Sequence, residues 1–146
     1  MSLKNFLERE LITCEPTAKI REVACLMHEN DVGAVLVTKA NKPEGIVTDR
    51  DIVIRCVAEG ADCANQTVDT IMSTPVETVS MDAGIHDVTS AMKASKIRRI
   101  PVVDKEGTAV GLLSFGDVFQ LIGKEVGDLA ASSAPESPKI VEKKAA

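Results

Sequence analysis

The sequence has very few aromatic residues and no excess of positive charge. Its 146 residues include three phenylalanines and no tryptophan or tyrosine, so any core must be built from aliphatic side chains. The 17 Lys and Arg residues are outnumbered by 22 Asp and Glu residues, which gives a net charge of −5. Nonspecific nucleic-acid binding needs a basic face and usually aromatic stacking platforms. The composition argues against that class of function, although a local basic cluster could still bind a small anion.

Long apolar runs are also missing. The longest clean run, Val32–Val37, has the length of a strand, whereas a membrane span needs about 18–20 apolar residues. The first ten residues carry acids where a secretory signal would have its apolar segment. These features predict a cytoplasmic protein that does not span a membrane.

The cysteines and histidines do not follow a metal-binding pattern. The cysteines lack CxxC spacing and the two histidines are isolated, so we expect no metal site. We interpret the cysteines as small buried hydrophobic residues in a reducing compartment, with one of them on an apolar helical stripe. They are Cys14, Cys25 (on the stripe), Cys56 and Cys63.

An internal repeat organises the chain. With a shift of 65 residues, Thr13–Thr38 aligns with Thr78–Val103, and six of the 26 positions are identical. After a one-residue insertion, GIVTDRD (Gly45–Asp51) aligns with GLLSFGD (Gly111–Asp117). Apolar spacing in each copy predicts a β-α-β-β-α unit of about 50 residues. Because half of the duplication would be marginal alone, we expect an α/β (α+β) fold of two pseudo-symmetric repeats packed through their sheets.

The expected elements follow from turn residues and helical spacing. The domain prediction is an extension over 1–9, a first repeat over 10–60, a linker over 61–74, a second repeat over 75–124, and a tail over 125–146, disordered from about 132. Each repeat is expected to open with a brief strand, Leu11–Cys14 or Val76–Val79, followed by a helix capped by Thr17 or Asp82. A polar turn then follows at Ala40–Glu44 or Asp104–Thr108. The second helix begins near Asp51 or Asp117. In the linker we expect a short helix at Val68–Met72.

A hydroxyl and an acid recur at each junction between the last strand and the second helix. Thr48-x-x-Asp51 and Ser114-x-x-Asp117 both match a capping box, in which the hydroxyl and the acid satisfy helix amides. The same geometry suits a nucleotide, because free amides attract phosphate and a carboxylate can bind ribose hydroxyls. The two interpretations are compatible.

Residues 10–124 resemble a pair of cystathionine-β-synthase (CBS) domains, also called a Bateman module. The resemblance rests on the tandem units, the two motifs and the segment KIRRIPVVD (Lys96–Asp104). The resemblance implies a non-catalytic, stand-alone regulatory module that binds AMP, ADP, ATP, NAD or S-adenosylmethionine, with AMP favoured, and signals to a partner protein. It also implies two clefts, in which the motif Asp holds ribose and the Ser or Thr contacts phosphate or ribose. By resemblance, one cleft combines Ile46, Thr48, Arg50, Asp51, Val76, Glu77, Thr78, Arg98, Arg99 and Pro101, and the other combines Leu112, Ser114, Asp117, Ile12, Thr13, Cys14, Gly33, Ala34 and Leu36, with Arg50 able to reach across.

The two clefts differ in charge. Arg98 and Arg99 flank the cleft of Asp51, whereas the matching positions of the other cleft are Gly33 and Ala34. Adjacent strand residues face opposite sides, so at most one arginine aims into a given cleft; a solvated surface pair is the alternative. We therefore expect the cleft of Asp51 to bind phosphate more tightly.

The last predictions concern the oligomeric state and three alternative functions. We expect a homodimer formed through helices that carry Val53, Val57, Leu121 and Ile122, unless these residues fill the core. Alternatives to the nucleotide-binding module are a protein-interaction scaffold with vestigial clefts, a thiol switch that uses exposed Cys56 or Cys63, and a hydrolase or deaminase of nucleotides. The last is disfavoured because the sequence lacks a metal-ligand pattern, and His28 and His86 also lack a nearby nucleophile pattern.

Overall fold

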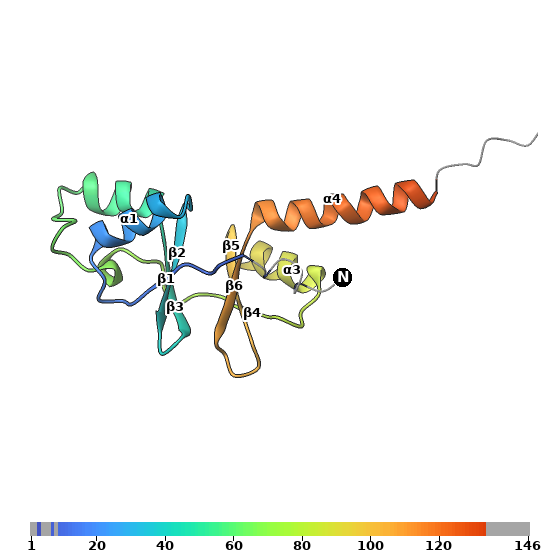
Figure 1. Cartoon of the computed structure of the whole chain (residues 1–146), viewed down its shortest axis with the longest axis horizontal. Helices are drawn as coiled ribbons and strands as arrows, with labels where there is room; N and C mark the ends of the chain where they lie inside the picture. Colours follow the sequence, from blue (N-terminus) through green and yellow to red (C-terminus); the bar gives the residue numbers. More distant parts are fainter. Residues whose placement is uncertain (1–2, 4–6, 8, 134–146) are drawn as a thin grey trace, which may run out of the picture.

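Two repeats of one architecture make up the fold (Figure 1). A computed structural model describes residues 3, 7 and 9–133. The first repeat contains β1 (Thr13–Cys14), α1 (Ile20–Glu29), β2 (Ala34–Lys39), β3 (Lys42–Thr48), α2 (Asp49–Ile52) and its continuation as the π-helix η2 (Val53–Val57). The second contains β4 (Val79–Ser80), α3 (Ile85–Ser95), β5 (Arg99–Val103), β6 (Ala109–Ser114) and α4 (Phe115–Ser132), and the 3-10 turn η3 (Val68–Thr70) lies between the repeats. The predicted fold class and repeated β-α-β-β-α order are confirmed.

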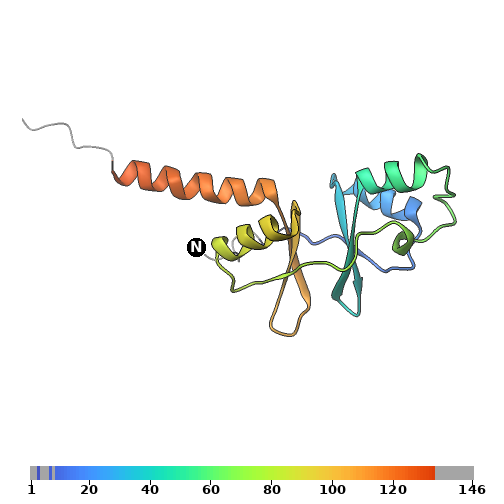
Figure 2. The same ribbon diagram turned by 180° about the vertical axis from the view of Figure 1, so that it is seen from behind.

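Each repeat forms a three-stranded sheet with its helices on one side. The strand orders are β1-β2-β3 and β4-β5-β6, with the first pair of each sheet parallel and the second antiparallel. The two sheets face each other and the helices lie outside them (Figure 1, Figure 2). Val35 and Val37 of β2 pack in the helix-side core, so strand alternation turns Ala34 and Leu36 toward the other sheet. The predicted site residues Ile46, Thr48, Leu112, Ser114, Arg99 and Pro101 share that inner face by the same alternation.

The core of each repeat is completed by a segment that precedes the other repeat's first strand. Val68 of the linker is fully buried in the core of the first repeat, and Leu3, 65 positions earlier, is 1% exposed in the core of the second. Met72 packs onto Gly45 and Leu7 onto Gly111, where a Cβ atom would collide with these side chains. The glycine that opens each motif therefore permits this close approach.

The helix starts differ from the predictions. Thr17 and Asp82 are not the caps: α1 follows Lys19 and α3 follows Gly84. Glu22 accepts a hydrogen bond from the Lys19 amide, and Asp87 accepts one from the Gly84 amide, each at 3.0 Å. An acid at the third helical position thus satisfies the cap amide without a cap side chain.

The second helices begin near Asp51 and Asp117 as predicted, whereas the turn of the first hairpin ends earlier than predicted. Helices α2 and α4 start two residues before Asp51 and Asp117, because Thr48 and Ser114 are the cap residues. In the hairpin, Ala40 and Asn41 take positive φ values of 49° and 62°, which suits a two-residue turn. Strand β3 can therefore begin at Lys42, inside the predicted turn.

Helix α4 continues past the predicted end of the second repeat. It runs to Ser132 and projects beyond the sheets (Figure 1), while the remaining predicted tail, residues 134–146, lies outside the described residues. The short helix predicted in the linker is present as η3. Over residues 3, 7 and 9–133, no helix combines the length and apolar character that a membrane crossing needs.

The cysteines differ from the prediction of four buried thiols. Cys56 and Cys63 form a disulfide, so they are not the exposed free thiols of the proposed switch. Cys56 is fully buried, whereas Cys25 is exposed, because α1 turns Ile20, Val23 and Met27 toward the core. Cys14 is half-buried and free.

Substitution of Leu3 by Ala should destabilise the fold by about 2–5 kcal/mol, because it removes a large side chain from a closed core. Val68→Ala, its pseudo-symmetric counterpart, should also destabilise, whereas Lys42→Ala on the surface should change stability by less than about 0.5 kcal/mol. Urea denaturation measures all three. Wild-type stability of Leu3→Ala would show that the N-terminal segment does not complete the second core.

Cys14 should react with iodoacetamide much more slowly than Cys25 at pH 8.5. Burial raises the pKa of the Cys14 thiol from 9.0 to about 11, with a smaller contribution from the charge of Glu15, and only the thiolate is nucleophilic. The folded state therefore keeps this proton longer than the unfolded chain. Its contribution to stability is complete below about pH 9 and is lost as the pH rises toward about 11. Peptide mass spectrometry follows the alkylation, and equal rates at the two cysteines would contradict the expectation.

Candidate functional site

Both motifs form complete capping boxes. The Asp51 amide donates to Thr48 Oγ1 at 3.1 Å, and Asp51 Oδ2 accepts from the Thr48 amide and hydroxyl, both at 2.9 Å. In the second repeat, the Asp117 amide donates to Ser114 Oγ at 3.1 Å, and Asp117 Oδ2 accepts from the Ser114 amide at 2.8 Å and hydroxyl at 2.7 Å. The capping interpretation is thus confirmed, and the second carboxylate oxygen, Oδ1, is not used by either box.

The surroundings of this second oxygen differ between the repeats. Asp117 Oδ1 accepts a hydrogen bond from Arg9 Nη1 at 3.0 Å, and the Arg9 side chain is 76% exposed. The Asp117 side chain is only 14% exposed, but among the described residues the exposed Arg9 is held by this one contact, and ion pairs at the surface are worth about 0–1 kcal/mol. Asp51 Oδ1 lies 3.7 Å from Arg55 Nε, and Arg55 also donates to the Ile71 carbonyl at 2.7 Å. Arg55 is therefore held in place more firmly than Arg9.

A cavity of about 260 Å³ opens beside Asp117. We call it the Asp117 pocket. It brings together six residues predicted for one cleft, namely Ile12, Gly33, Ala34, Leu112, Ser114 and Asp117. Six further lining residues were not predicted from the sequence: Leu7, Arg9, Glu10, Leu11, Val32 and Gly111. Leu7 could have been found from the sequence, because the 65-residue shift that relates the repeats also relates the N-terminal segment to the linker.

Arg99 also lines the Asp117 pocket, although it was predicted for the cleft of Asp51. Arg99 lies opposite Ser114 in the β5–β6 register, so its side chain starts beside the second motif. A Cβ on Gly33 would lie 3.6 Å from Arg99 Nη2. The guanidinium therefore extends into space that the small residues Gly33 and Ala34 leave open.

Arg98 takes a different direction. Its guanidinium carbon lies 5.8 Å from the centre of the Phe115 ring, a cation–π distance. Arg98 and Arg99 nevertheless both line the larger cavity described next, which differs from the prediction that at most one of them aims into a given cleft.

A second cavity, of about 460 Å³, lies where the two motifs meet. We call it the arginine cleft. Its lining contains three arginines and one acid: Thr48, Asp49, Arg50, Arg98, Arg99, Ser114, Phe115 and Gly116. Three guanidinium groups beside the N-terminus of the 18-residue helix α4 favour an anion. Arg99 and Ser114 line both cavities, so the arginine cleft adjoins the Asp117 pocket.

The remaining predicted contacts line neither cavity. Ile46 pairs through its backbone with Ser73 of the linker, with hydrogen bonds of 3.1 and 2.9 Å, so that edge of β3 is already occupied. Leu36 is fully buried and pairs with Thr13. The residues outside both cavities are Ile46, Asp51, Val76, Glu77, Thr78, Pro101, Thr13, Cys14 and Leu36.

Comparison with known proteins identifies both repeats. The CBS domain profile matches residues 3–57 and 68–124. The chain is 34% identical over 122 residues to the uncharacterised protein MK0525 of Methanopyrus kandleri, covering 83% of this chain but only 62% of that protein. It is 33% identical over 117 residues to the CBS domain-containing protein YhcV of Bacillus subtilis, covering 80% and 82% of the two chains.

Solved structures show the same arrangement. The CBS domain protein PAE2072 of Pyrobaculum aerophilum, complexed with AMP, is 28% identical with a TM-score of 0.73, covering 85% of this chain and 99% of that one. The CBS domain pair of protein MJ0100, in complex with 5′-methylthioadenosine and S-adenosyl-L-methionine, is 25% identical with a TM-score of 0.74, covering 86% and 98%. The duplicated motifs, the facing sheets and these matches agree, and the chain belongs to the CBS domain family as a tandem pair.

Proposed function

We propose that the protein is a regulatory module that binds an adenosine-containing nucleotide, with AMP favoured, and signals to a partner protein. The observation that carries the proposal is the presence of Asp117 and Arg99 in one cavity. A carboxylate there can accept hydrogen bonds from both ribose hydroxyls, and an arginine fork suits phosphate. The AMP bound by PAE2072, and the 5′-methylthioadenosine and S-adenosyl-L-methionine bound by MJ0100, support an adenosine-containing ligand.

A nucleotide in this position would use both cavities. The ribose displaces Arg9 from Asp117 Oδ1, and the base lies against the apolar side chains of Ile12, Ala34 and Leu112. The phosphate extends past Ser114 toward Arg99 and the arginine cleft, where Arg50 and Arg98 also lie. The Asp51 cleft, with Ile46, Val76, Glu77, Thr78 and Pro101 as its remaining predicted contacts, is proposed as the weaker site.

This order reverses the sequence-based ranking of the clefts, because Arg99 lines the Asp117 pocket. A hydrogen bond to a charged group contributes about 1.5–3 kcal/mol, and about 1.4 kcal/mol corresponds to tenfold in affinity. One arginine–phosphate contact therefore separates the clefts by about ten- to a hundredfold.

We also propose a homodimer that forms through an apolar seam on α4. Phe115, Phe119, Ile122, Val126 and Leu129 recur at intervals of four and three residues, and they are 41–68% exposed. Such spacing is typical of a helix that packs against another helix. Of the residues predicted for the contact, Val53, Val57 and Ile122 are exposed, but Leu121 is 1% exposed and belongs to the core.

Charge favours an antiparallel pairing of two α4 helices. The first half of the seam borders a groove of about 470 Å³ between α3 and α4, lined in part by Lys93, Lys96 and Arg98. The second half carries two acids, Glu125 and Asp128, and one base, Lys124. Antiparallel helices place the acids of one copy beside the bases of the other, and a two-fold axis makes the contact reciprocal.

Calorimetric titration with AMP tests the nucleotide site. Asp117→Asn should weaken binding by about ten- to a hundredfold, since ribose loses an anionic acceptor while the amide oxygen can still accept from the helix cap. Asp51→Asn is the matched control and should change the tight phase less than about threefold. Arg99→Ala should weaken AMP by a similar factor but leave adenosine binding unchanged, because adenosine has no phosphate.

Four outcomes would contradict the proposal. Loss of the tight phase in Asp51→Asn but not in Asp117→Asn would restore the other cleft as the principal site. Equal affinity for AMP and GMP would exclude adenine selectivity. Unchanged melting over millimolar nucleotide would favour the interaction scaffold, because a ligand of the folded state must raise its stability, and turnover of AMP, ADP or ATP would favour an enzyme.

Light scattering at micromolar concentration tests the dimer. The wild type should have a mass near twice 15.5 kDa, and Phe119→Asp should convert it to a monomer, since the charge enters the centre of the seam. Gln120→Asp, one position along the same helix and also exposed, is the matched control and should remain dimeric. A wild-type mass near 15.5 kDa with and without nucleotide would rule out the dimer.

A further inference from the structure

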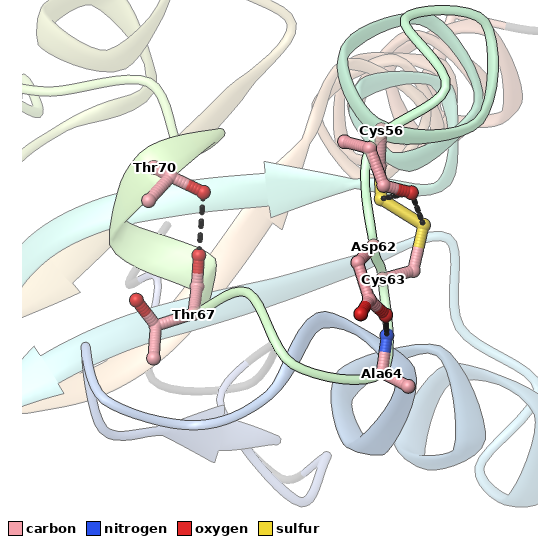
Figure 3. Close-up of a disulfide and its surroundings, with 7 residues drawn as sticks. Cys56, Asp62, Cys63, Ala64, Thr67 and Thr70 are labelled. Carbon is pink, nitrogen blue, oxygen red and sulfur yellow. Dashed lines mark hydrogen bonds between the residues drawn. A yellow bond between two sulfur atoms is a disulfide. The ribbon is translucent and has the colours of Figure 1, made fainter.

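Cys56 and Cys63 lie seven residues apart in sequence and are joined by a disulfide, with their Cα atoms 6.1 Å apart (Figure 3). Cys56 belongs to η2, and Cys63 belongs to the loop that follows it. We propose that this pair is a thiol–disulfide exchange site that reacts with small thiols and disulfides and secures the helical segment carrying Asp51. The proposal relies on the nucleotide site only in treating Asp51 as a ligand group.

The disulfide lies where the two repeats diverge. A shift of 66 residues aligns Cys56 with Ile122 and Cys63 with Leu129, and both of those residues belong to the continuous helix α4. In the first repeat the helix ends at Val57, and Gly60 adopts a φ of 67°, a conformation that favours glycine. The chain then turns back toward η2, where the covalent bond fixes it.

The same loop can accommodate the reduced pair. The Ala61 carbonyl oxygen lies 3.7 Å from Cys56 Sγ and 3.8 Å from Cys63 Sγ. After reduction, each thiol therefore has an acceptor within reach for its weak S–H donor. Cys56 is fully buried in the core of the first repeat, where a thiol packs as a small hydrophobic residue. Reduction thus requires no buried polar group to lose its partner.

Burial also indicates which sulfur reacts first. Cys63 is half-buried whereas Cys56 is inaccessible, so the thiolate of a small dithiol attacks Cys63 Sγ. The bond to Cys56 breaks, and its electron pair goes to Cys56 Sγ, which takes up a proton. The second thiol of the reagent then displaces Cys63, which is also protonated, so two electrons and two protons pass from the dithiol to the pair. A small disulfide reverses the reaction.

The helix side of the bond leads directly to Asp51. Helix η2 continues α2, which carries Asp51. Arg55, the residue before Cys56, lies 3.7 Å from Asp51 Oδ1 and is anchored on the Ile71 carbonyl. The position of η2 therefore determines where Arg55 stands relative to the carboxylate.

The loop side of the bond holds the start of α1. The Cys63 carbonyl accepts from the Arg21 amide at 2.9 Å, and the Gln66 carbonyl accepts from the Ile20 amide at 3.1 Å. Lys19 Nζ also donates to the Asn65 carbonyl at 2.7 Å. The disulfide thus connects the helix that bears Asp51 to the loop that caps α1, and all of these contacts join the first repeat to the linker that packs on it.

Hydrogen exchange of the full chain, with and without dithiothreitol and without nucleotide, tests the proposal. Reduction should increase exchange at least about tenfold over residues 53–66 and the first turn of α1, and leave β5 and β6 unchanged. The melting temperature should fall by about 5–10 °C, as expected for the loss of a bond that closes a short loop. Re-oxidation with oxidised glutathione should restore both values.

Cys63→Ser should match the reduced wild type and should not respond to dithiothreitol, whereas Cys25→Ser should respond as the wild type does. Alkylation of the unfolded, unreduced protein should modify only Cys14 and Cys25. Modification of all four cysteines after incubation with oxidised glutathione would overturn the proposal. So would an equal response of both repeats to dithiothreitol, or no response. Because no nucleotide is present, failure here is distinct from failure of the nucleotide site.

Discussion

Burial of both sheet faces is the constraint on which the rest of the structure depends. Each sheet packs one face on its own helices and turns the other toward the second sheet (Figure 2). Residues 34–38 of β2 are consequently buried without interruption, which leaves little space for polar side chains along the strand. Polar groups such as Thr48, Asp51, Ser114 and Asp117 are instead found where a strand passes into a helix. There one set of residues both ends the strand and presents a carboxylate.

Small differences between the repeats turn a nearly symmetric frame into two unlike sites. Asp49 of the first motif is replaced by Phe115 in the second, and Arg98 lies over that ring. Gly33 occupies the position that corresponds to Arg98 and leaves room for Arg99 to cross toward it. The cations of both repeats therefore gather around the second motif. Backbone symmetry is retained, because the Asp49 amide donates to the Gly33 carbonyl as the Phe115 amide does to the Arg98 carbonyl.

The sequence predicted those features that local spacing determines. The order of helices and strands along each repeat and both capping boxes follow from residues a few positions apart, and both are present. The direction of Arg99 was not predictable in this way, because it depends on cross-strand register with Ser114 and on space beside Gly33. Leu121 and Cys25 were placed on the wrong sides of their helices for a related reason. Apolar residues cover more than one face of each helix, and only packing selects the buried one.

The two repeats end differently. In the second repeat the last helix continues to Ser132 and carries an exposed apolar seam from Phe115 to Leu129. In the first, the chain turns back after Val57 and is fixed by the bond between Cys56 and Cys63. A long exposed helix can pack against another chain, whereas a cross-linked turn can change its rigidity only locally. Since Asp51 lies on the cross-linked helix and Asp117 on the projecting one, each capping-box carboxylate is joined directly to the element in which the two repeats differ.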